Sequence, residues 1–259
     1  MRYEKILYEV KANIAWITLN QPDKKNALSN RMMREISDAL MQARDDHLVK
    51  VIVITGAGDQ AFCAGADINE FRGNSTLENR NQYGLYAKLC LAFHSLGKPS
   101  IAAVNGLALA GGCGLSLYPD ITIASEKARF GTPEINVGIW PMMVSVSLLR
   151  AVGRKKALEL MCTGEMIDAY EAAKIGLINK VVAANQLEST VMELAEKLKS
   201  KSPAIMKLGL DAFYNMSDME FSQAVMYLRE MIVVLLNTED SQEGVTAFLE
   251  KRKPQWKGN

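Results

Sequence analysis

The stretch LALAGGCGLSL, residues 107–117, carries the glycines Gly111, Gly112 and Gly114 between two apolar runs. Glycine inside a regular element costs about 0.5–1 kcal/mol relative to alanine, so such a cluster needs a physical reason. Two interpretations are open. The cluster forms either a tight strand-to-helix turn packed on a neighbouring element, or a place where a ligand lies against the main chain.

Short β-rich runs alternate with helical patterns on both sides of this stretch. Several runs are apolar throughout, as expected for strands in a sheet that is covered on both faces. The expected strands are IAWITL (14–19), VIVIT (51–55), SIAAV (100–104), DITIA (120–124) and INKVV (178–182). The expected helices between them cover 29–45, 80–96 and 111–118. This alternation predicts an α/β fold with crossover connections.

The β signal ends near residue 184, and helical patterns follow to the C-terminus. They cover 187–202, 203–216, 219 to about 237, and about 240–251. Ser217 and Glu220 have the spacing of a capping box for the third of these helices. The sequence thus predicts an α/β core over 1–184 and a helical region over 185–259. Apolar runs such as MIVVLLN favour self-association through the helical region.

Charge and N-terminal composition exclude several classes of protein. The 30 Lys and Arg nearly balance the 29 Asp and Glu, which gives no basic surface for nucleic acid. The opening MRYEKILYEV lacks the apolar core of a signal peptide, and no apolar run reaches the roughly 18 residues of a membrane span. We therefore expect a soluble, cytoplasmic protein with no membrane or nucleic-acid partner.

Metal and histidine chemistry are poorly supported. The cysteines are Cys63, Cys90, Cys113 and Cys162, far apart and without metal-ligand spacing, so buried free thiols are expected. The two histidines, His47 and His94, are isolated from each other in the sequence.

Two turns of small residues, CAGAD (63–67) and LAGGCG (109–114), each follow a buried strand and precede a segment that can begin a helix. Main-chain N–H groups at such turns are unpaired, and the helix dipole adds partial positive charge. If the two turns converge, they can bind an anionic oxygen as an oxyanion hole does. The G-x-G at 56–58 lacks the further glycine of a dinucleotide fingerprint.

Glu134 is the candidate acid/base. It is the acid of FGTPEINVGIWP, flanked by Pro133 and Ile135. A carboxyl group in apolar surroundings has a raised pKa and can exchange protons near neutral pH. The alternative is a glutamate that caps a helix or pairs with an arginine.

Together these motifs resemble the enoyl-CoA hydratase/isomerase (crotonase) family over essentially the whole chain. They are LNQPDKKNALS, AFCAGADI, IAAVNGLALAGGCGL, ARFGTPEINVGIWP, AVGRKKALELMCTGEMIDAYEAAKIGLINKVV and EGVTAFLEKRKPQWK. The resemblance implies a spiral of ββα units, a C-terminal helical region that builds homotrimers or hexamers, and acyl-CoA thioester substrates. It implies no cofactor, because coenzyme A is part of the substrate, and no metal.

The resemblance also assigns roles to single residues. The N–H groups of Ala66 and Gly111 match the two oxyanion-hole donors, and Glu134 matches the second of the two family glutamates. The implied CoA-binding residues are Lys24, Lys25, Ala64, Ala66, Asp67, Ile68, Gly111 and Trp140. Among them, the two lysines match basic residues near the CoA phosphates, although a solvated loop explains them nearly as well.

The chain departs from the hydratase pattern at two places. Gly114 stands where hydratases of the family carry their first glutamate, so one proton-handling group of concerted hydration is missing. The segment after Glu134 reads WPMMVSV, in which Trp140, Met142 and Met143 are expected to add bulk beside the acyl pocket. Given room, Gly114→Glu is expected to place a carboxyl group opposite Glu134.

A single glutamate suffices for moving a double bond, because one carboxyl group can remove a proton and return it elsewhere. Double-bond isomerisation of an enoyl-CoA is therefore the leading hypothesis. Hydration of a 2-enoyl-CoA, a ring closure of the dihydroxynaphthoyl-CoA synthase type and a non-catalytic acyl-CoA binder remain open. A nucleic-acid binder has little support, since KRKPQWK is the strongest basic cluster.

Overall fold

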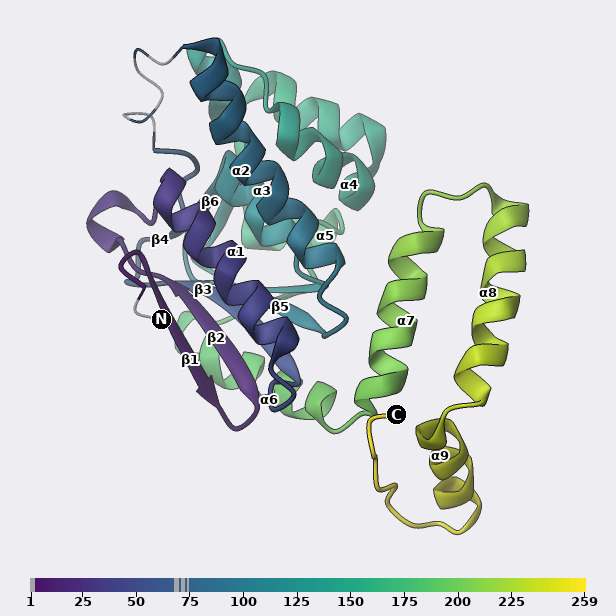
Figure 1. The fold of residues 1–259 in the computed structure, drawn as a ribbon. Helices are drawn as coiled ribbons and strands as arrows, with labels where there is room; N and C mark the ends of the chain where they lie inside the picture. The colour runs from purple at the N-terminus through teal and green to yellow at the C-terminus, as the bar shows by residue number, and fades with distance from the viewer. Residues whose placement is uncertain (1–2, 68–69, 71–72, 74) are drawn as a thin grey trace.

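The computed structural model describes residues 3–67, 70, 73 and 75–259, and in these residues the strands form two sheets (Figure 1). The larger has the order β1-β2-β3-β5-β7-β10 and is parallel except for the pairing of β1 with β2. Its strands are β1 Ile6–Lys11, β2 Ile14–Leu19, β3 Val51–Gly56, β5 Ser100–Val104, β7 Ile121–Ser125 and β10 Lys180–Val182. The strands expected from the sequence are confirmed, with ends shifted by one or two residues.

The smaller sheet has the order β4-β6-β8-β9. Its strands are β4 Ala61–Cys63, β6 Leu107–Leu109, β8 Arg129–Gly131 and β9 Met166–Asp168. The first three run parallel, and β9 is antiparallel to β8. The sequence did not predict these strands, because three residues are too few to show a period.

The chain passes between the two sheets in a repeated order. The strands β3 and β4 lead to α2 (Thr76–His94), β5 and β6 lead to α3 (Gly111–Leu117), and β7 and β8 lead to α4 (Met142–Thr163). In each repeat the first strand joins the larger sheet and the second joins the smaller one. The expected spiral of ββα units is confirmed.

A buried core supports the smaller sheet. Phe62 on β4 and Phe130 on β8 have no exposed surface. Helix α1 (Asn30–Asp45) begins at Ser29, whose hydroxyl accepts a hydrogen bond from the N–H of Met32, and it packs beside α2. The loops that follow β4, β6 and β8 therefore begin at strands that are packed on this core.

The C-terminal helices differ in how much of the core they touch. They are α5 Ala169–Lys174, α6 Leu187–Lys199, α7 Pro203–Met216, α8 Phe221–Leu236 and α9 Glu239–Leu249. Helix α6 packs on the larger sheet through Leu187, Val191 and Ala195, whereas α7, α8 and α9 extend away from the core (Figure 1). The domain boundary between 184 and 185 stays a prediction. No helix of the described residues is long and apolar enough to cross a membrane.

The capping box expected from Ser217 and Glu220 is wrong. The Ser217 hydroxyl donates to the carbonyl of Phe213 at the end of α7, and α8 begins at Phe221 without a side-chain cap. Ser217 is thus used by the preceding helix, where a serine can bond back to a carbonyl four residues earlier.

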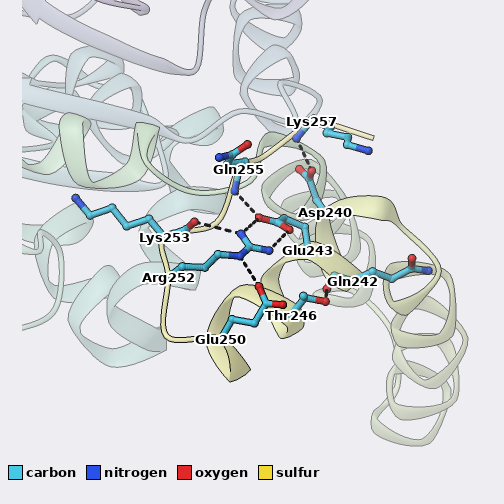
Figure 2. Close-up of polar contacts among 9 residues, drawn as sticks. All are labelled: Asp240, Gln242, Glu243, Thr246, Glu250, Arg252, Lys253, Gln255 and Lys257. Atoms are coloured by element: carbon cyan, nitrogen blue, oxygen red, sulfur yellow. Dashed lines mark hydrogen bonds and ion pairs between the residues drawn. The ribbon is translucent and has the colours of Figure 1, made fainter.

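The last residues fold back along α9 (Figure 2). The Arg252 guanidinium binds both carboxylate oxygens of Glu243 and also contacts Glu250. The N–H of Lys257 donates to Asp240, and the Trp256 indole donates to the carbonyl of Ser200. Several polar groups of the basic segment KRKPQWK are therefore engaged within the chain.

Candidate active site

Three loops leave the same edge of the smaller sheet. CAGAD begins at the last residue of β4, the glycine turn follows β6, and Glu134 lies three residues after β8. Because β4, β6 and β8 are parallel neighbours, their carboxyl ends meet at one edge. Ligands of α/β folds bind at such edges. The topology thus brings the main sequence-based candidates together.

The CAGAD turn is held by the segment that precedes α1. Ala66 forms an isolated parallel bridge with Leu28. The N–H of Leu28 donates to the Gly65 carbonyl at 2.7 Å, and the N–H of Asp67 donates to the Leu28 carbonyl at 3.1 Å. In a parallel bridge of this kind, the N–H of the intervening residue points to the opposite side. The Ala66 N–H therefore faces away from Leu28.

The glycine turn starts from a left-handed residue. Ala110 has φ = 53°, and its N–H donates to the Gly131 carbonyl at 2.9 Å, which joins the turn to the end of β8. Gly111 is the first residue of α3, where N–H groups have no partner inside the helix. Within the described residues, neither the Gly111 N–H nor the Ala66 N–H donates a hydrogen bond.

The two turns pack directly on each other. A Cβ atom added to Gly65 would lie 2.7 Å from the Cβ atom of Ala110, and one added to Gly112 would overlap the Cys63 carbonyl. Only glycine allows this approach, and Gly65 also has φ = 96°. The interpretation of the cluster as a tight packed turn is confirmed, and a ligand against its main chain stays a prediction.

Glu134 lies half-buried in a short helix, η3 (Pro133–Val137). Its Oε2 atom is buried and has no hydrogen-bond partner in the part of the chain that the structure describes. Burial raises the pKa of this carboxyl group above its ordinary value. Burial, and to a smaller extent the charge of Glu134, raises the pKa of the Cys113 thiol in α3. Among the described residues Glu134 takes part in no ion pair with an arginine.

Two of the expected CoA-binding residues, Lys24 and Lys25, contact the CAGAD turn. The Lys24 ammonium, in η1 (Pro22–Lys24), bonds to Asp67 at 3.2 Å, and the Lys25 carbonyl accepts the Ala64 N–H at 3.0 Å. The Lys24 and Lys25 side chains are exposed, and Asp67 is buried. Ile68 lies outside the described residues. These contacts tie the lysine loop to the turn that carries Ala66.

The residues after Glu134 are spread over different environments. Trp140 and Met143 are partly buried against the core, whereas Met142 is 71% exposed. The α4 residue nearest to Gly114 is Val144, because a Cβ atom on Gly114 would lie 3.2 Å from its Cγ2. Met142 therefore does not pack beside the glycine turn within this chain.

Sequence reasoning missed two residues, Tyr86 and Asn26. The Tyr86 hydroxyl, from α2, donates to the Gly111 carbonyl at 2.7 Å. Asn26 has no exposed surface and φ = 54°, and its amide donates to the carbonyls of Ala57 and Ala61. Asparagine in DKKNALS was a signal for the left-handed turn. Nothing in the local sequence marks Tyr86, since its contact is purely tertiary.

The comparisons with known proteins agree with this geometry. The family profile described as enoyl-CoA hydratase/isomerase matches residues 9–259. The short-chain-enoyl-CoA hydratase of Clostridium acetobutylicum is 38% identical over 98% of this chain and 97% of its own. The crotonyl-CoA hydratase of Syntrophomonas wolfei is 38% identical over 98% of each chain. The crystal structure of an enoyl-CoA hydratase from Bacillus anthracis is 34% identical, with a TM-score of 0.94 over 99% of this chain and 100% of that one.

The fold and these relatives define an acyl-CoA enzyme of the crotonase type. The chain belongs to the enoyl-CoA hydratase/isomerase family, whose members act on acyl-CoA thioesters.

Proposed function

We infer that the protein moves the double bond of an enoyl-CoA, with Glu134 as its single acid/base. The C2–H bond of a 3-enoyl-CoA breaks, and the proton passes to the Glu134 carboxylate. The electron pair forms an enolate, whose negative oxygen lies between the N–H groups of Ala66 and Gly111. Glu134 then returns the proton to C4, so that the double bond ends between C2 and C3.

The observation that carries this proposal is the environment of Glu134. Its Oε2 is buried without a partner among the described residues, at the sheet edge where the two N–H groups are free. A carboxyl group with a raised pKa is a better proton donor near neutral pH than an ordinary glutamate. It can therefore serve both halves of the reaction. The proposed chemistry needs no metal and no cofactor beyond the CoA of the substrate.

Hydration of a 2-enoyl-CoA is the second candidate, because relatives with 38% identity are named hydratases. Against it stands Gly114, which supplies no second carboxyl group. The hydroxyl of Tyr86 and the side chain of Val144 border the space beside this glycine. Hydration would thus need an acid or an ordered water from elsewhere.

A panel of CoA thioesters tests the proposal. The protein is incubated separately with 3-enoyl-CoA, crotonyl-CoA and saturated acyl-CoA esters. Because 2-enoyl-CoA and 3-enoyl-CoA have the same mass, the products are separated by reversed-phase chromatography against authentic standards before mass spectrometry. We expect 2-enoyl-CoA from the 3-enoyl ester, with slower hydration of crotonyl-CoA. Rapid formation of 3-hydroxybutyryl-CoA from crotonyl-CoA would show that the protein is a hydratase, and the isomerase proposal would be wrong. Binding without any product would identify a non-catalytic acyl-CoA binder.

We also propose a homotrimer or a hexamer in the cytoplasm. Helix α8 buries only Ala224 among its described residues, while Phe221 on α8 and Phe248 on α9 are 84% and 82% exposed. Apolar faces of this extent mark surfaces that another chain covers. Light scattering that gives the mass of a single chain at micromolar concentration would contradict the assembly.

A further inference from the structure

Tyr86 contacts the glycine turn at two points. Its hydroxyl donates to the Gly111 carbonyl, and its ring lies where a Cβ atom on Gly111 would be 3.5 Å from Cε2. A Cβ atom on Gly114 would come closer than 3.0 Å to the same hydroxyl oxygen, a separation that Cβ atoms do not adopt. One side chain from α2 thus touches the oxyanion turn and occupies the space beside the missing hydratase acid.

We propose that Tyr86 is a positioning and specificity-determining residue: it fixes the Gly111 main chain as an oxyanion donor and fills the space over Gly114. This inference rests on the proposed function for the role of Gly111. It assigns to a buried aromatic side chain two effects that together favour enolate proton transfer over addition of water.

The first effect follows from the freedom of glycine. Without a Cβ atom, Gly111 can rotate its peptide planes more easily than any other residue. On one side, the Ala110 N–H is bonded to Gly131. On the other side, the Gly111 carbonyl is bonded to Tyr86. The peptide plane between them, which carries the Gly111 N–H, is also held, because the Ala110 carbonyl accepts a hydrogen bond from the Gly114 N–H at 3.2 Å. With the peptide planes on both sides of Gly111 held, the Gly111 N–H keeps one direction, as a preorganised oxyanion hole requires.

The second effect follows from the rigidity of Tyr86. The side chain is buried, and its ring meets that of Tyr118 edge to face at 6.5 Å between centroids. Tyr118 in turn stacks on Phe93 at 6.4 Å. Burial raises the pKa of the Tyr86 phenol well above its ordinary value, so the hydroxyl stays a donor. The hydroxyl therefore cannot swing aside at low cost.

This packing corrects an expectation from the sequence. Gly114→Glu was expected to place a carboxyl group opposite Glu134 if room existed. The room is taken by the Tyr86 hydroxyl and, at 3.2 Å, by Val144. A glutamate at position 114 requires a prior change at position 86.

The positioning role is tested with Tyr86→Phe, which removes the hydroxyl and keeps the ring. Tyr118→Phe is the matched control, because it removes a neighbouring phenol that does not contact Gly111. The first readout is the carbonyl stretch of carbonyl-labelled acetyl-CoA bound to each variant, measured by difference infrared spectroscopy. We expect Tyr86→Phe to shift this band toward its frequency in free acetyl-CoA, and Tyr118→Phe to leave it unchanged. An unshifted band in Tyr86→Phe, or equal shifts in both variants, overturns the positioning role.

The rate gives a second readout. A Gly111 N–H that is less firmly aligned with the enolate oxygen should lower kcat roughly 3–10-fold in Tyr86→Phe, with KM unchanged. This comparison uses whichever product the wild type forms, so hydration by the wild type would refute the isomerase proposal without refuting the role of Tyr86. If the wild type shows no turnover, the infrared band alone tests the positioning role of Tyr86.

The space-filling role is tested by a cycle of Gly114→Ala, Tyr86→Phe and the double variant. Alanine normally stabilises a helix position relative to glycine. Here we expect Gly114→Ala to lower the thermal midpoint in the wild type, and to lower it by less than half as much in the Tyr86→Phe background. Equal losses in both backgrounds would show that the hydroxyl does not occupy this space.

Discussion

The smaller sheet and helices α7 to α9 differ in how far their side chains are buried within the chain. At the sheet edge, Ala66, Gly111 and Glu134 lie in the loops that follow β4, β6 and β8, and the turns contact each other through glycines. The three helices instead extend from the core and expose many apolar side chains (Figure 1). The difference teaches that the candidate site residues are held by contacts within one chain, and it supports the proposal that another chain covers the helical region.

The largest expected effect is at the sheet edge. Glu134→Gln keeps the size of the side chain but cannot take up a proton. If Glu134 is the acid/base, kcat should fall about 10²–10⁴-fold, while the Kd for acyl-CoA changes little. Steady-state kinetics and calorimetry measure the two quantities. Glu165→Gln, an exposed glutamate before β9, serves as the control and should retain wild-type kcat.

In the helical region, we expect a substitution to change the mass of the assembly. Ile232→Asp puts a charge on the exposed apolar face of α8. Burying an unpaired charge in an interface is strongly unfavourable, so the assembly should dissociate toward the mass of one chain, 28.6 kDa. Multi-angle light scattering measures the mass. Gln223→Asp, on an exposed polar position of α8, is the control, and an unchanged mass in Ile232→Asp would place the interface elsewhere.

The long strands, α1 and the helices after residue 184 were predictable from their apolar patterns, whereas α4 (Met142–Thr163) and α5 (Ala169–Lys174) were not predicted. The three-residue strands were not, although they carry the site. Convergence of CAGAD with the glycine turn entered through the family resemblance, and the structure adds the physical cause in the close approach of Gly65 to Ala110 and of Gly112 to Cys63. Tyr86 could not be found because its hydrogen bond spans 25 positions of the chain. Ser217 misled because its hydroxyl bonds backward rather than forward.

A smaller effect is expected in the loop that supports the CAGAD turn. Asn26→Ala removes the hydrogen bonds to Ala57, Ala61 and Gln21 from a buried site and leaves main-chain groups unpaired. The free energy of unfolding should fall by about 1–3 kcal/mol. Urea denaturation of this variant is compared with that of Asn185→Ala, an exposed asparagine. Equal stabilities would mean that Asn26 does not hold the loop.

The smallest effect concerns pH. Because burial raises the pKa of Glu134, the folded state binds its proton more tightly than the unfolded state. The resulting stability is fully present below the unfolded pKa and is lost as pH rises through the folded pKa. Glu134→Gln cannot ionise, so its thermal midpoint should exceed that of the wild type at about pH 8 but not at about pH 4. If Glu134→Gln raised the thermal midpoint equally at both pH values, ionisation of Glu134 would not destabilise the folded state.

The most direct test of single-carboxylate chemistry is the fate of solvent oxygen. The wild type is given a 3-enoyl-CoA in water enriched in oxygen-18. Early products are separated by reversed-phase chromatography, which resolves 2-enoyl-CoA from 3-enoyl-CoA, and are then analysed by mass spectrometry. Proton transfer by Glu134 predicts a 2-enoyl-CoA of unchanged oxygen content, and no such product with Glu134→Gln. A 3-hydroxyacyl-CoA carrying one oxygen-18 as the main early product, or an isomerisation that survives Glu134→Gln, would contradict it.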